Sequence, residues 1–293
     1  MIPITTMTKS SHSFESITRL TMKHFIELKD SRLDLQAMVT MTRKTVADQG
    51  YIVFRNFHYD LNDLEKTKNL FIQLCEMVGT PISHDQHGSI VWDIKSNPNS
   101  TGPVKTYSEH NHQAELHTDS QYSFYPEDMF ALLSLQKAKC GGGLSHLKSL
   151  KNILNRLKAL PDGDEITRIL SNTDFPFIVP NVFKKDNSKK YEFNFGPILR
   201  NNEIRFRIDT FEKAFQIDNS FCSEEQISAY GKLKKVITDD LDLTEFMMEP
   251  GDLIIINNKT MLHGRSSFTD SNRHILRIRM NKHAKGQRKG EVQ

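Results

Sequence analysis

The order of hydrophobic and polar residues predicts a helix, a strand and a second helix near the start of the chain. Apolar residues recur at helical spacing over 31–49. Residues 51–54, Tyr-Ile-Val-Phe, form a short continuous apolar run of the kind found in buried strands. A second helical pattern then runs to Gly79, and Asn62 and Glu65 have the spacing of a capping box at its start.

Further along the chain the pattern changes to short runs that alternate or are rich in β-formers. Strands are predicted over residues 89–94, 129–136, 191–195, 203–208, 252–256 and 274–280. One more helix is predicted at 224–239, where Ser223 and Gln226 form a capping box. Many short strands with few helices favour a mainly β fold with helical additions, built as a sandwich or barrel.

The chain length fits one large domain or two small ones, and its 293 residues suffice for a substantial core. No internal repeat and no clear linker is present, which favours one domain. The N-terminal segment 1–30 is rich in Ser and Thr, and no element is assigned to it. We expect a single domain over 31–280, with an insertion at about 150–245, followed by a basic tail over 281–293.

Composition excludes several classes of partner. The net charge is +3, and the tail alone carries four basic residues against one acidic residue, so the body is close to neutral and no nucleic-acid footprint is expected. Cys75, Cys140 and Cys222 are odd in number and widely spaced, which predicts neither a disulfide framework nor a zinc site. No apolar run approaches the ~18 residues of a membrane span, and no signal-peptide pattern is present. We expect a cytoplasmic protein with a small-molecule substrate, without a membrane or nucleic-acid partner; the oligomeric state is not predicted.

Two distant histidine motifs carry the candidate chemistry. The run Glu-Leu-His-Thr-Asp at 115–119 contains a His-x-Asp pair, and Met-Leu-His-Gly-Arg follows at 261–265. On an extended strand His117 and Asp119 share one face and can reach the same ion. Together with His263 they would form the 2-His-1-carboxylate site of non-haem iron oxygenases, which leaves positions open for a co-substrate and dioxygen.

The other histidines have simpler interpretations. His58 and Asp60 form a second His-x-Asp pair, but in a polar segment that predicts a surface turn. The remaining candidates are interpreted as loop or structural residues: His84, His87, His110, His112, His146 and His274.

Taken in order along the chain, these motifs resemble a known family. Together with Lys-Cys-Gly-Gly-Gly at 139–143, Pro-Gly-Asp at 250–252 and Asn-Lys-Thr-Met-Leu-His-Gly-Arg at 258–265, they are similar to the taurine dioxygenase-like (TauD/TfdA) superfamily of Fe(II)/2-oxoglutarate-dependent oxygenases. The His-Gly-Arg context resembles its clavaminate synthase-like branch. The resemblance covers about residues 50–280. It implies a double-stranded β-helix (jelly-roll) core with a lid-bearing insertion, and the use of Fe(II), 2-oxoglutarate as co-substrate and dioxygen.

The resemblance also implies roles for single residues. His117, Asp119 and His263 would be the iron ligands. Arg273, ten residues beyond His263, matches the arginine that pairs with the distal carboxylate of 2-oxoglutarate. The planar guanidinium suits this role because it can bind a carboxylate through two parallel hydrogen bonds. Ser145 stands where the family has a threonine, so it would supply the assisting hydroxyl without the methyl group.

Alternation along the strands suggests further contacts with co-substrate or substrate. Arg277 lies four residues past Arg273, on the same face of a strand, and would reach the substrate or the same co-substrate. Arg279 continues the alternation and is interpreted as a charged strand residue in water. Glu115, with Gln113 alternating with it, would hold a cationic amine, although a solvated carboxylate is the alternative for Glu115. Such a set would suit an amino acid.

The predicted enzyme oxidises an unactivated C–H bond of a small molecule, most simply by hydroxylation, and releases succinate and CO2. An amino acid or a natural-product intermediate is the expected substrate. Two alternatives remain open: an oxygenase acting on a protein or carrier-tethered substrate, and a non-catalytic metal-binding jelly-roll protein. A halogenase is disfavoured because the Asp119 carboxylate leaves no position for chloride. Trp92, Tyr122 and Phe124 are expected either to wall the pocket or to belong to the core.

Overall fold

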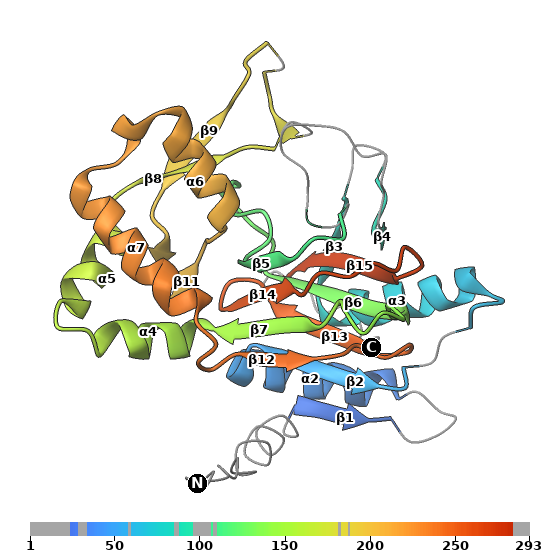
Figure 1. Cartoon of the computed structure of the whole chain (residues 1–293). Helices are drawn as coiled ribbons and strands as arrows, with labels where there is room; N and C mark the ends of the chain where they lie inside the picture. The colour runs from blue at the N-terminus through green and yellow to red at the C-terminus, as the bar shows by residue number, and fades with distance from the viewer. Residues whose placement is uncertain are drawn as a thin grey trace, which may run out of the picture.

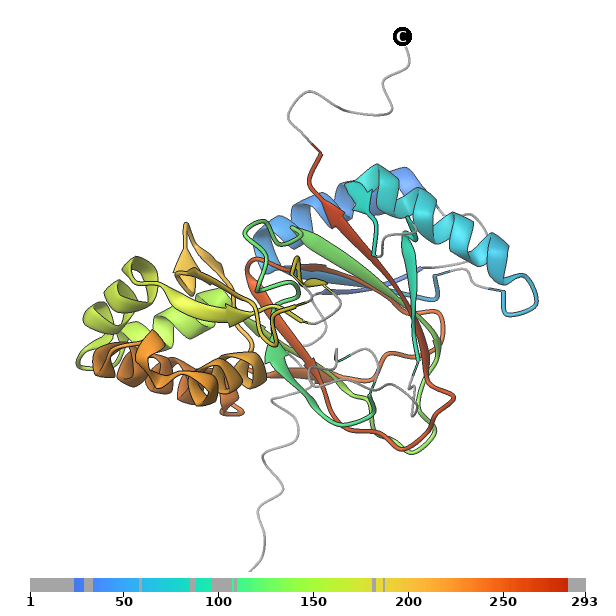
Figure 2. The same cartoon turned by 90° about the horizontal axis from the view of Figure 1, so that it is seen from above.

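Two β-sheets face each other in the centre of the molecule, and helices lie outside them (Figures 1 and 2). The computed structural model describes residues 24–28, 34–57, 60–84, 88–95, 107, 110–180, 183–186 and 188–283. Two helices cover the outer face of the larger sheet, and a group of helices lies together at one side of both sheets. The predicted mainly β fold with helical additions is confirmed at this level.

The larger sheet has seven strands. In spatial order they are β1 (Phe25–Glu27), β2 (Tyr51–Arg55), β13 (Leu253–Asn257), β6 (Met129–Gln136), β15 (His274–Asn281) and β3 (Thr80–Ile82), with β4 (Val91–Ile94) also paired to β15. β1 and β2 are parallel, whereas the other pairs are antiparallel. The smaller, antiparallel sheet has the order β12 (Thr244–Phe246), β7 (Ser145–Ser149), β14 (Met261–Arg265) and β5 (Ala114–His117).

The central strands β2 and β13 of the larger sheet are buried on both faces, which explains their continuous apolar runs. Successive side chains of a strand point to opposite faces. Val53 and Ile254 therefore pack toward the smaller sheet, while Ile52 and Leu253 pack on the other face, in the core shared with the two covering helices. The apolar run 51–54 is a buried strand, as predicted.

The two covering helices begin at aspartate caps. α2 (Leu35–Gln49) ends at Gly50, whose φ of 86° is the left-handed conformation that favours glycine. α3 (Leu64–Val78) is capped by Asp63, which accepts from the Lys66 N–H. The predicted capping box of Asn62 and Glu65 is wrong, because the N–H of Asn62 donates to a carboxylate in the preceding turn.

The helical group connects neighbouring strands of the smaller sheet. It contains α4 (Leu150–Lys158), α5 (Gly163–Asn172), α6 (Ile208–Ile217), the short helix η3 (Asn219–Phe221) and α7 (Glu224–Thr238), with the strand pairs β8 (Phe175–Ile178) with β9 (Phe193–Gly196) and β10 (Leu199–Arg200) with β11 (Glu203–Ile204). Ile153, Leu170, Phe211 and Leu233 belong to its common core. α7 starts with the predicted capping box.

Sequence patterns misplace several elements in this part of the chain. The predicted strand 203–208 is only the two-residue β11, because α6 begins at residue 208. β9 begins two residues later than predicted. The same holds for β4, which belongs to the larger sheet. α4, α5 and α6 were not predicted.

A buried lysine fastens the helical group to the smaller sheet. Lys148 of β7 is 1% exposed. Its ammonium group donates to the carbonyl oxygens of Val236, Ile237 and Asp239 and pairs with the Asp239 carboxylate at 3.1 Å. The carbonyls at the end of α7, which lack partners within the helix, are thus satisfied by a cation.

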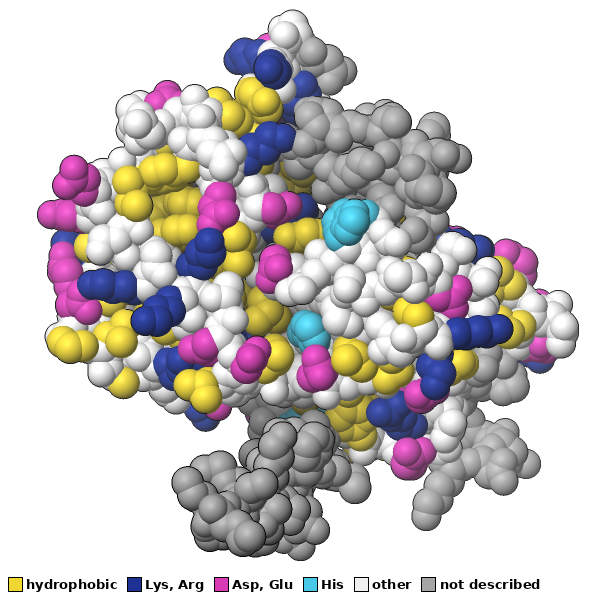
Figure 3. All heavy atoms as spheres, in the orientation of Figure 1, with side chains coloured by type: hydrophobic (Ala, Val, Ile, Leu, Met, Phe, Trp, Pro, Cys, Tyr) yellow, Lys and Arg dark blue, Asp and Glu magenta, His cyan; other side chains and the backbone are white. Residues whose placement is uncertain are grey.

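The surface carries charges of both signs. Acidic and basic side chains are interspersed over the face drawn in Figure 3. In the described part of the chain, no helix is long and apolar enough to cross a membrane.

Candidate active site

The two halves of the histidine motif meet across one pair of strands. β5 and β14 are antiparallel, and His117 lies directly opposite His263, with ring centroids 4.2 Å apart. Gly264 permits this close approach, because a Cβ atom there would stand 2.7 Å from the carbonyl oxygen of Ala114. Two imidazoles from segments 146 residues apart in the sequence are therefore neighbours at the inner face of the smaller sheet.

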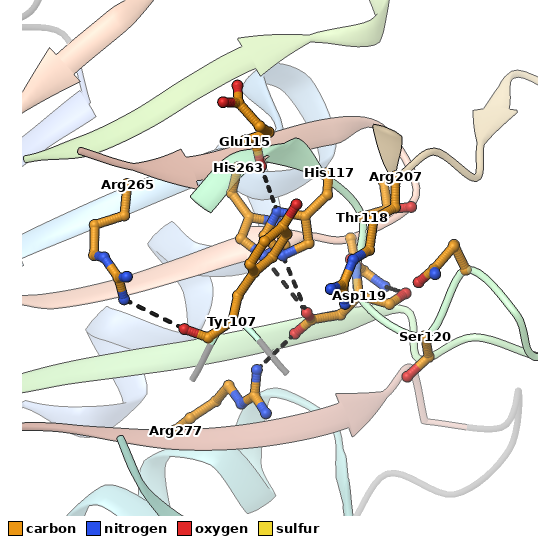
Figure 4. Close-up of polar contacts among 12 residues, drawn as sticks. Tyr107, Glu115, His117, Thr118, Asp119, Ser120, Arg207, His263, Arg265 and Arg277 are labelled. Atoms are coloured by element: carbon orange, nitrogen blue, oxygen red, sulfur yellow. Dashed lines mark hydrogen bonds and ion pairs between the residues drawn. The ribbon is translucent and has the colours of Figure 1, made fainter. Parts of the chain in front are cut away.

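Three side chains converge on one point (Figure 4). His117 Nε2 lies 3.6 Å from Asp119 Oδ1, and His263 Nε2 lies 3.7 Å from the same oxygen. The three candidate ligand atoms are all within 4.8 Å of one another, and no other group of metal-ligating side chains occurs among the described residues. This donor set could hold a metal ion.

Hydrogen bonds aim the ligand atoms of His117 and Asp119 at that point, whereas the Nδ1 of His263 has no hydrogen-bond partner among the described residues. The Nδ1–H of His117 donates to the carbonyl oxygen of Glu115 at 2.8 Å, which leaves the Nε2 lone pair for a metal. Burial and the neighbouring His263 lower the pKa of His117 to about 4, so its imidazole is neutral at physiological pH. Burial alone would raise the pKa of Asp119, but Arg277, at 3.0 Å from Oδ2, and the two histidines hold it well below its usual range. The carboxylate is therefore ionised and its Oδ1 faces the histidines.

These side chains line a cavity of about 780 Å³ between the two sheets. Its volume is in the range of small-molecule sites. Phe130 of β6 packs on the His263 ring at 4.5 Å, and Trp92 and Tyr122 form other parts of the wall. Phe124, which the sequence also offered as a wall or core residue, is 59% exposed at the surface.

Arg273 presents a buried cation without a counter-charge. The residue is 8% exposed and lines the cavity, and its guanidinium has no hydrogen-bond or ion-pair partner among the described residues. Burial, with a contribution from nearby Arg265, lowers its pKa to about 9. Gly143, with a φ of 80°, lies against it, so a Cβ there would stand 3.1 Å from Arg273 Nε. Ser145, at the start of β7, also lines this cavity.

Three arginines near the end of the chain line the cavity: Arg273, which immediately precedes β15, and Arg277 and Arg279, which lie at alternate positions of that strand. Arg277 faces the same cavity as Arg273, as predicted, and pairs with Asp119. The interpretation of Arg279 as a water-facing residue is wrong. Its guanidinium lies 3.6 Å from the buried Glu127 carboxylate and donates to the Ser83 carbonyl oxygen, because the inner face of β15 is enclosed and the alternation continues into the cavity.

The structure places Gln113 and Glu115 outside the cavity lining. Gln113 is exposed, and the carboxylate of Glu115 points away from the three converging side chains (Figure 4). The physical reason is a bulge in β5, where the register shifts between His263 and Arg265. An extra residue in a strand breaks the alternation, so Ala114 takes the place on the inner face that regular spacing gives to Glu115.

Sequence reasoning missed a cluster that connects the helical group to the histidines. The Tyr107 ring packs against His117 at 4.6 Å, and the Arg207 guanidinium lies 4.0 Å above that ring. Asp209, in the first turn of α6, binds Arg207 through two contacts of 2.7 Å, and burial and Asp209 together raise the pKa of Tyr107. The spacing of residues along the sequence gives no signal for the contact between Tyr107 and Arg207, which are 100 positions apart.

The other histidines take mostly structural positions. His146 pairs with Glu245 at 2.7 Å, and His274 pairs with Asp93 at 2.5 Å. His84 differs from its interpretation as a loop residue, because it is buried, stacks on Trp92 and lines the cavity. The carbonyl oxygens of His110 and His112 accept from Arg265. His58 and His87 lie outside the described residues.

A comparison with protein families decides the identity of this arrangement. Residues 19–279 match the taurine catabolism dioxygenase TauD, TfdA family. The chain belongs to this family. Its members are Fe(II)- and 2-oxoglutarate-dependent dioxygenases, so the protein is an enzyme of that class, and Fe(II), 2-oxoglutarate and dioxygen are its cofactor and co-substrates, as predicted. A search of curated protein sequences finds no match.

Solved structures share the fold of this TauD/TfdA family member. Asparagine oxygenase in complex with Fe(II), 2S,3S-3-hydroxyasparagine and succinate has a TM-score of 0.65 at 17% identity, over 86% of this chain and 80% of that one. The non-haem iron oxygenase OrfP in complex with Fe and alpha-ketoglutaric acid has a TM-score of 0.62 at 20% identity, over 84% and 80%. OrfP in complex with Fe and L-Arg has a TM-score of 0.59 at 18% identity, over 84% and 80%.

Proposed function

We propose that the protein hydroxylates an unactivated C–H bond of a free amino acid or a small derivative, at an iron ion held by His117, Asp119 and His263. The observation that carries this proposal is the convergence of three ligand atoms within 4.8 Å, beside a buried arginine that lacks a counter-charge. When bound, iron, 2-oxoglutarate and dioxygen together supply the oxidation, with release of succinate and CO2.

The three ligands have the donor set that ferrous iron requires. Two imidazoles and one carboxylate on one side of an ion leave its other side open. His117 is held in the ligating tautomer by the Glu115 carbonyl oxygen, and Asp119 keeps one oxygen free because Arg277 occupies the other. The protein therefore contributes a preset geometry, so little reorganisation is needed when the metal enters.

Arg273 is the proposed holder of the distal carboxylate of 2-oxoglutarate. A buried guanidinium without a partner is costly, and a bidentate carboxylate satisfies both its charge and its donors. Ser145 would add a hydroxyl from β7. Arg277 has one Nη on Asp119 and an Nε without a hydrogen-bond partner among the described residues, so it could also reach the co-substrate or the substrate.

The substrate would occupy the rest of the cavity, beneath the helical group. The two oxygenases with a similar fold were crystallised with hydroxyasparagine or L-Arg, which supports an amino acid. The role predicted for Gln113 and Glu115 as holders of an amine gains no support from the cavity lining. Tyr107, Arg207 and Tyr122 line the cavity and are better placed to contact the substrate.

We further propose that the two sheets are the halves of a double-stranded β-helix, with about 150–245 as an insertion. Support comes from β12, which returns from the helical group and pairs with β7, the strand from which the chain departed. The insertion would thus begin and end on neighbouring strands and cover one end of the cavity.

Anaerobic titration tests the proposal directly. Addition of Fe(II) and then 2-oxoglutarate to metal-free protein should give the weak visible charge-transfer band of a chelated keto acid. His117→Ala should abolish the band. His146→Ala, in which the lost imidazole pairs with Glu245 away from the site, should retain it. His58→Ala, in the other His-x-Asp pair, should retain it as well.

Substrate identity needs a second measurement. Free amino acids are added one at a time in air, and succinate and hydroxylated product are quantified. A visible band without stimulation by any amino acid would reject the substrate class but keep the iron site. No band in the wild-type protein, and no succinate, would reject the proposed site itself.

A further inference from the structure

Asn258 makes an unusual set of contacts with the main chain of the candidate carboxylate ligand. Its Oδ1 accepts from the N–H of Asp119 at 2.8 Å, and its Nδ2 donates to the carbonyl oxygen of Asp119 at 3.1 Å. The same Nδ2 donates to the carbonyl oxygen of Glu127 at 3.1 Å. Asn258 is 1% exposed, and its own N–H donates to the carbonyl oxygen of Asp128 at 2.9 Å. One side chain therefore satisfies both backbone groups of Asp119.

The main chain at Asp119 needs such a partner because no strand supports it. The ladder between β5 and β14 ends at His117, and Asp119 already belongs to the turn that follows. The next residue, Ser120, has a φ of 51°, a left-handed conformation that costs free energy for residues other than glycine. A conformation of this kind persists where surrounding contacts fix it.

The side chain of Asp119 is fixed separately. Arg277 binds Oδ2 at 3.0 Å, while Oδ1 faces His117 and His263. Rotation of the carboxylate is limited by Arg277, but the position of its Cα depends on the main chain. A primary amide is the side-chain group that offers an acceptor and two donors together, so neither a carboxylate nor a hydroxyl could make the same three bonds.

We propose that Asn258 is a positioning residue that places Asp119 for metal binding by replacing the missing strand partner of its main chain. This inference rests on the proposed function, since it takes Asp119 as a ligand. Asn258 does not touch the metal position itself. It acts through the backbone of Asp119, so its loss should loosen one of three ligands while the two histidines keep their places on β5 and β14.

The test measures metal affinity rather than turnover. Co(II) is titrated into metal-free protein under anaerobic conditions for the wild type and for Asn258→Ala, and metal-free stability is measured by urea unfolding. Removal of groups that orient metal ligands typically weakens metal binding by roughly 10- to 100-fold. We expect a loss of Co(II) affinity in that range.

Asn257 provides the matched control. It precedes Asn258 and is 8% exposed, and its Oδ1 accepts from the Lys259 N–H within the same turn, away from Asp119. Asn257→Ala therefore removes a comparable amide and one turn hydrogen bond. We expect its Co(II) affinity to stay within about threefold of the wild type. Asn258→Ser, which leaves room for water beside the freed backbone groups, serves as the second variant where Asn258→Ala is insoluble.

Each outcome has a separate meaning. A large loss of Co(II) affinity in the Asn258 variant, at a stability equal to that of Asn257→Ala, supports the proposal. Equal Co(II) affinities in the two variants would overturn it. Failure of both Asn258 variants to fold, while Asn257→Ala folds, would assign Asn258 to the fold alone and would also overturn it. A wild-type protein that binds no Co(II) would instead reject the proposed iron site.

Discussion

Replacement of Arg273 by methionine should change stability and co-substrate affinity in opposite directions. In the absence of an anion, Arg273 is a buried cation, and burial lowers its pKa to about 9. Each pKa unit corresponds to about 1.4 kcal/mol, so a displacement of this size represents roughly 4–5 kcal/mol of unfavourable free energy in the folded state. Methionine fills similar space without the charge.

The net gain in stability should be smaller than this figure. Arg273 also lies 5.2 Å from the Phe268 ring, and that favourable contact is lost with the charge. We expect the free energy of unfolding of the metal-free protein to rise by about 1–3 kcal/mol in Arg273→Met. The lowered pKa still lies above neutral pH, so the guanidinium is charged and the penalty is complete there.

Affinity for 2-oxoglutarate should fall in the same variant. Removal of one partner from a buried, hydrogen-bonded charge pair costs about 2–5 kcal/mol, which corresponds to roughly 30-fold to several thousand-fold in Kd. Urea unfolding of the metal-free protein measures the first effect. Anaerobic titration of the Fe(II)-loaded protein with 2-oxoglutarate, followed by the visible band, measures the second.

Arg279→Met is the matched control, because Arg279 of β15 lines the same cavity as Arg273. Arg279 neutralises Glu127, which is 2% exposed, so its removal leaves a buried carboxylate without its cation and should destabilise the protein by about 1–3 kcal/mol. Its affinity for 2-oxoglutarate should change less than about threefold. Destabilisation in both variants, or an unchanged Kd in Arg273→Met, would refute the assignment of Arg273 as the anion holder.

Three further predictions concern other parts of the molecule. Lys148→Met should lower the free energy of unfolding by about 2–4 kcal/mol in urea, because the carbonyl oxygens of Ile237 and Asp239 lose the lysine as donor, while that of Val236 keeps Arg156; an unchanged midpoint would show that the contact is not stabilising. Cys140 is exposed, and the N–H of Thr269 and neighbouring backbone donors lower its pKa to about 6, so its alkylation by iodoacetamide should rise to half its maximal rate near pH 6. Peptide mass spectrometry should find the buried Cys75 and Cys222 unmodified at that pH, and a half-maximal rate above pH 8 for Cys140 would contradict the thiolate assignment. Gly264→Ala should separate β5 from β14 and weaken Co(II) binding at least tenfold, since its Cβ would meet a carbonyl oxygen at 2.7 Å; wild-type affinity would show that the strands can shift without cost to the site.

The candidate ligands could be predicted because their signal is local. His-x-Asp on an extended segment and a distant histidine before Gly-Arg identify three side chains, and the structure brings His117, Asp119 and His263 together. The buried strands could be predicted as well, since a continuous apolar run such as 51–54 requires burial on both faces. These inferences need only the spacing of residues along a strand and the chemistry of their side chains.

Other features depend on the register between strands, which the sequence does not display. Glu115 would share a face with His117 on a regular strand, but a bulge in β5 turns it away. Arg279 alternates correctly, yet its environment is set by Glu127, a residue 152 positions earlier in the chain. The sequence shows Asn258 only as part of a motif. Its hydrogen bonds go to the main chain of Asp119, and main-chain contacts do not depend on which residue type stands at that position.

The unpredicted helices show a different limit. In α4 the buried residues Leu150, Ile153 and Leu157 have helical spacing, and Ser149 caps the helix. The sequence therefore carries a helical signal at α4, although the pattern of the flanking strands alone indicates only an insertion between them. α6 lacks a side-chain cap, and its first residue, Ile208, completes the alternating polar and apolar pattern of 203–208, so the sequence pattern there favours a strand over a helix.

The arginines at alternate positions of β15 have a consequence for folding. Leu276 and Ile278, which lie between Arg277 and its neighbours, face the opposite side and pack beneath α2 and α3. A slip of one residue in the pairing of β15 with β6 would drive guanidinium groups into that apolar layer and expose leucine and isoleucine to the cavity. The arginines that line the cavity therefore also disfavour a misaligned β15. The folding sheet has one strongly favoured register between β15 and β6.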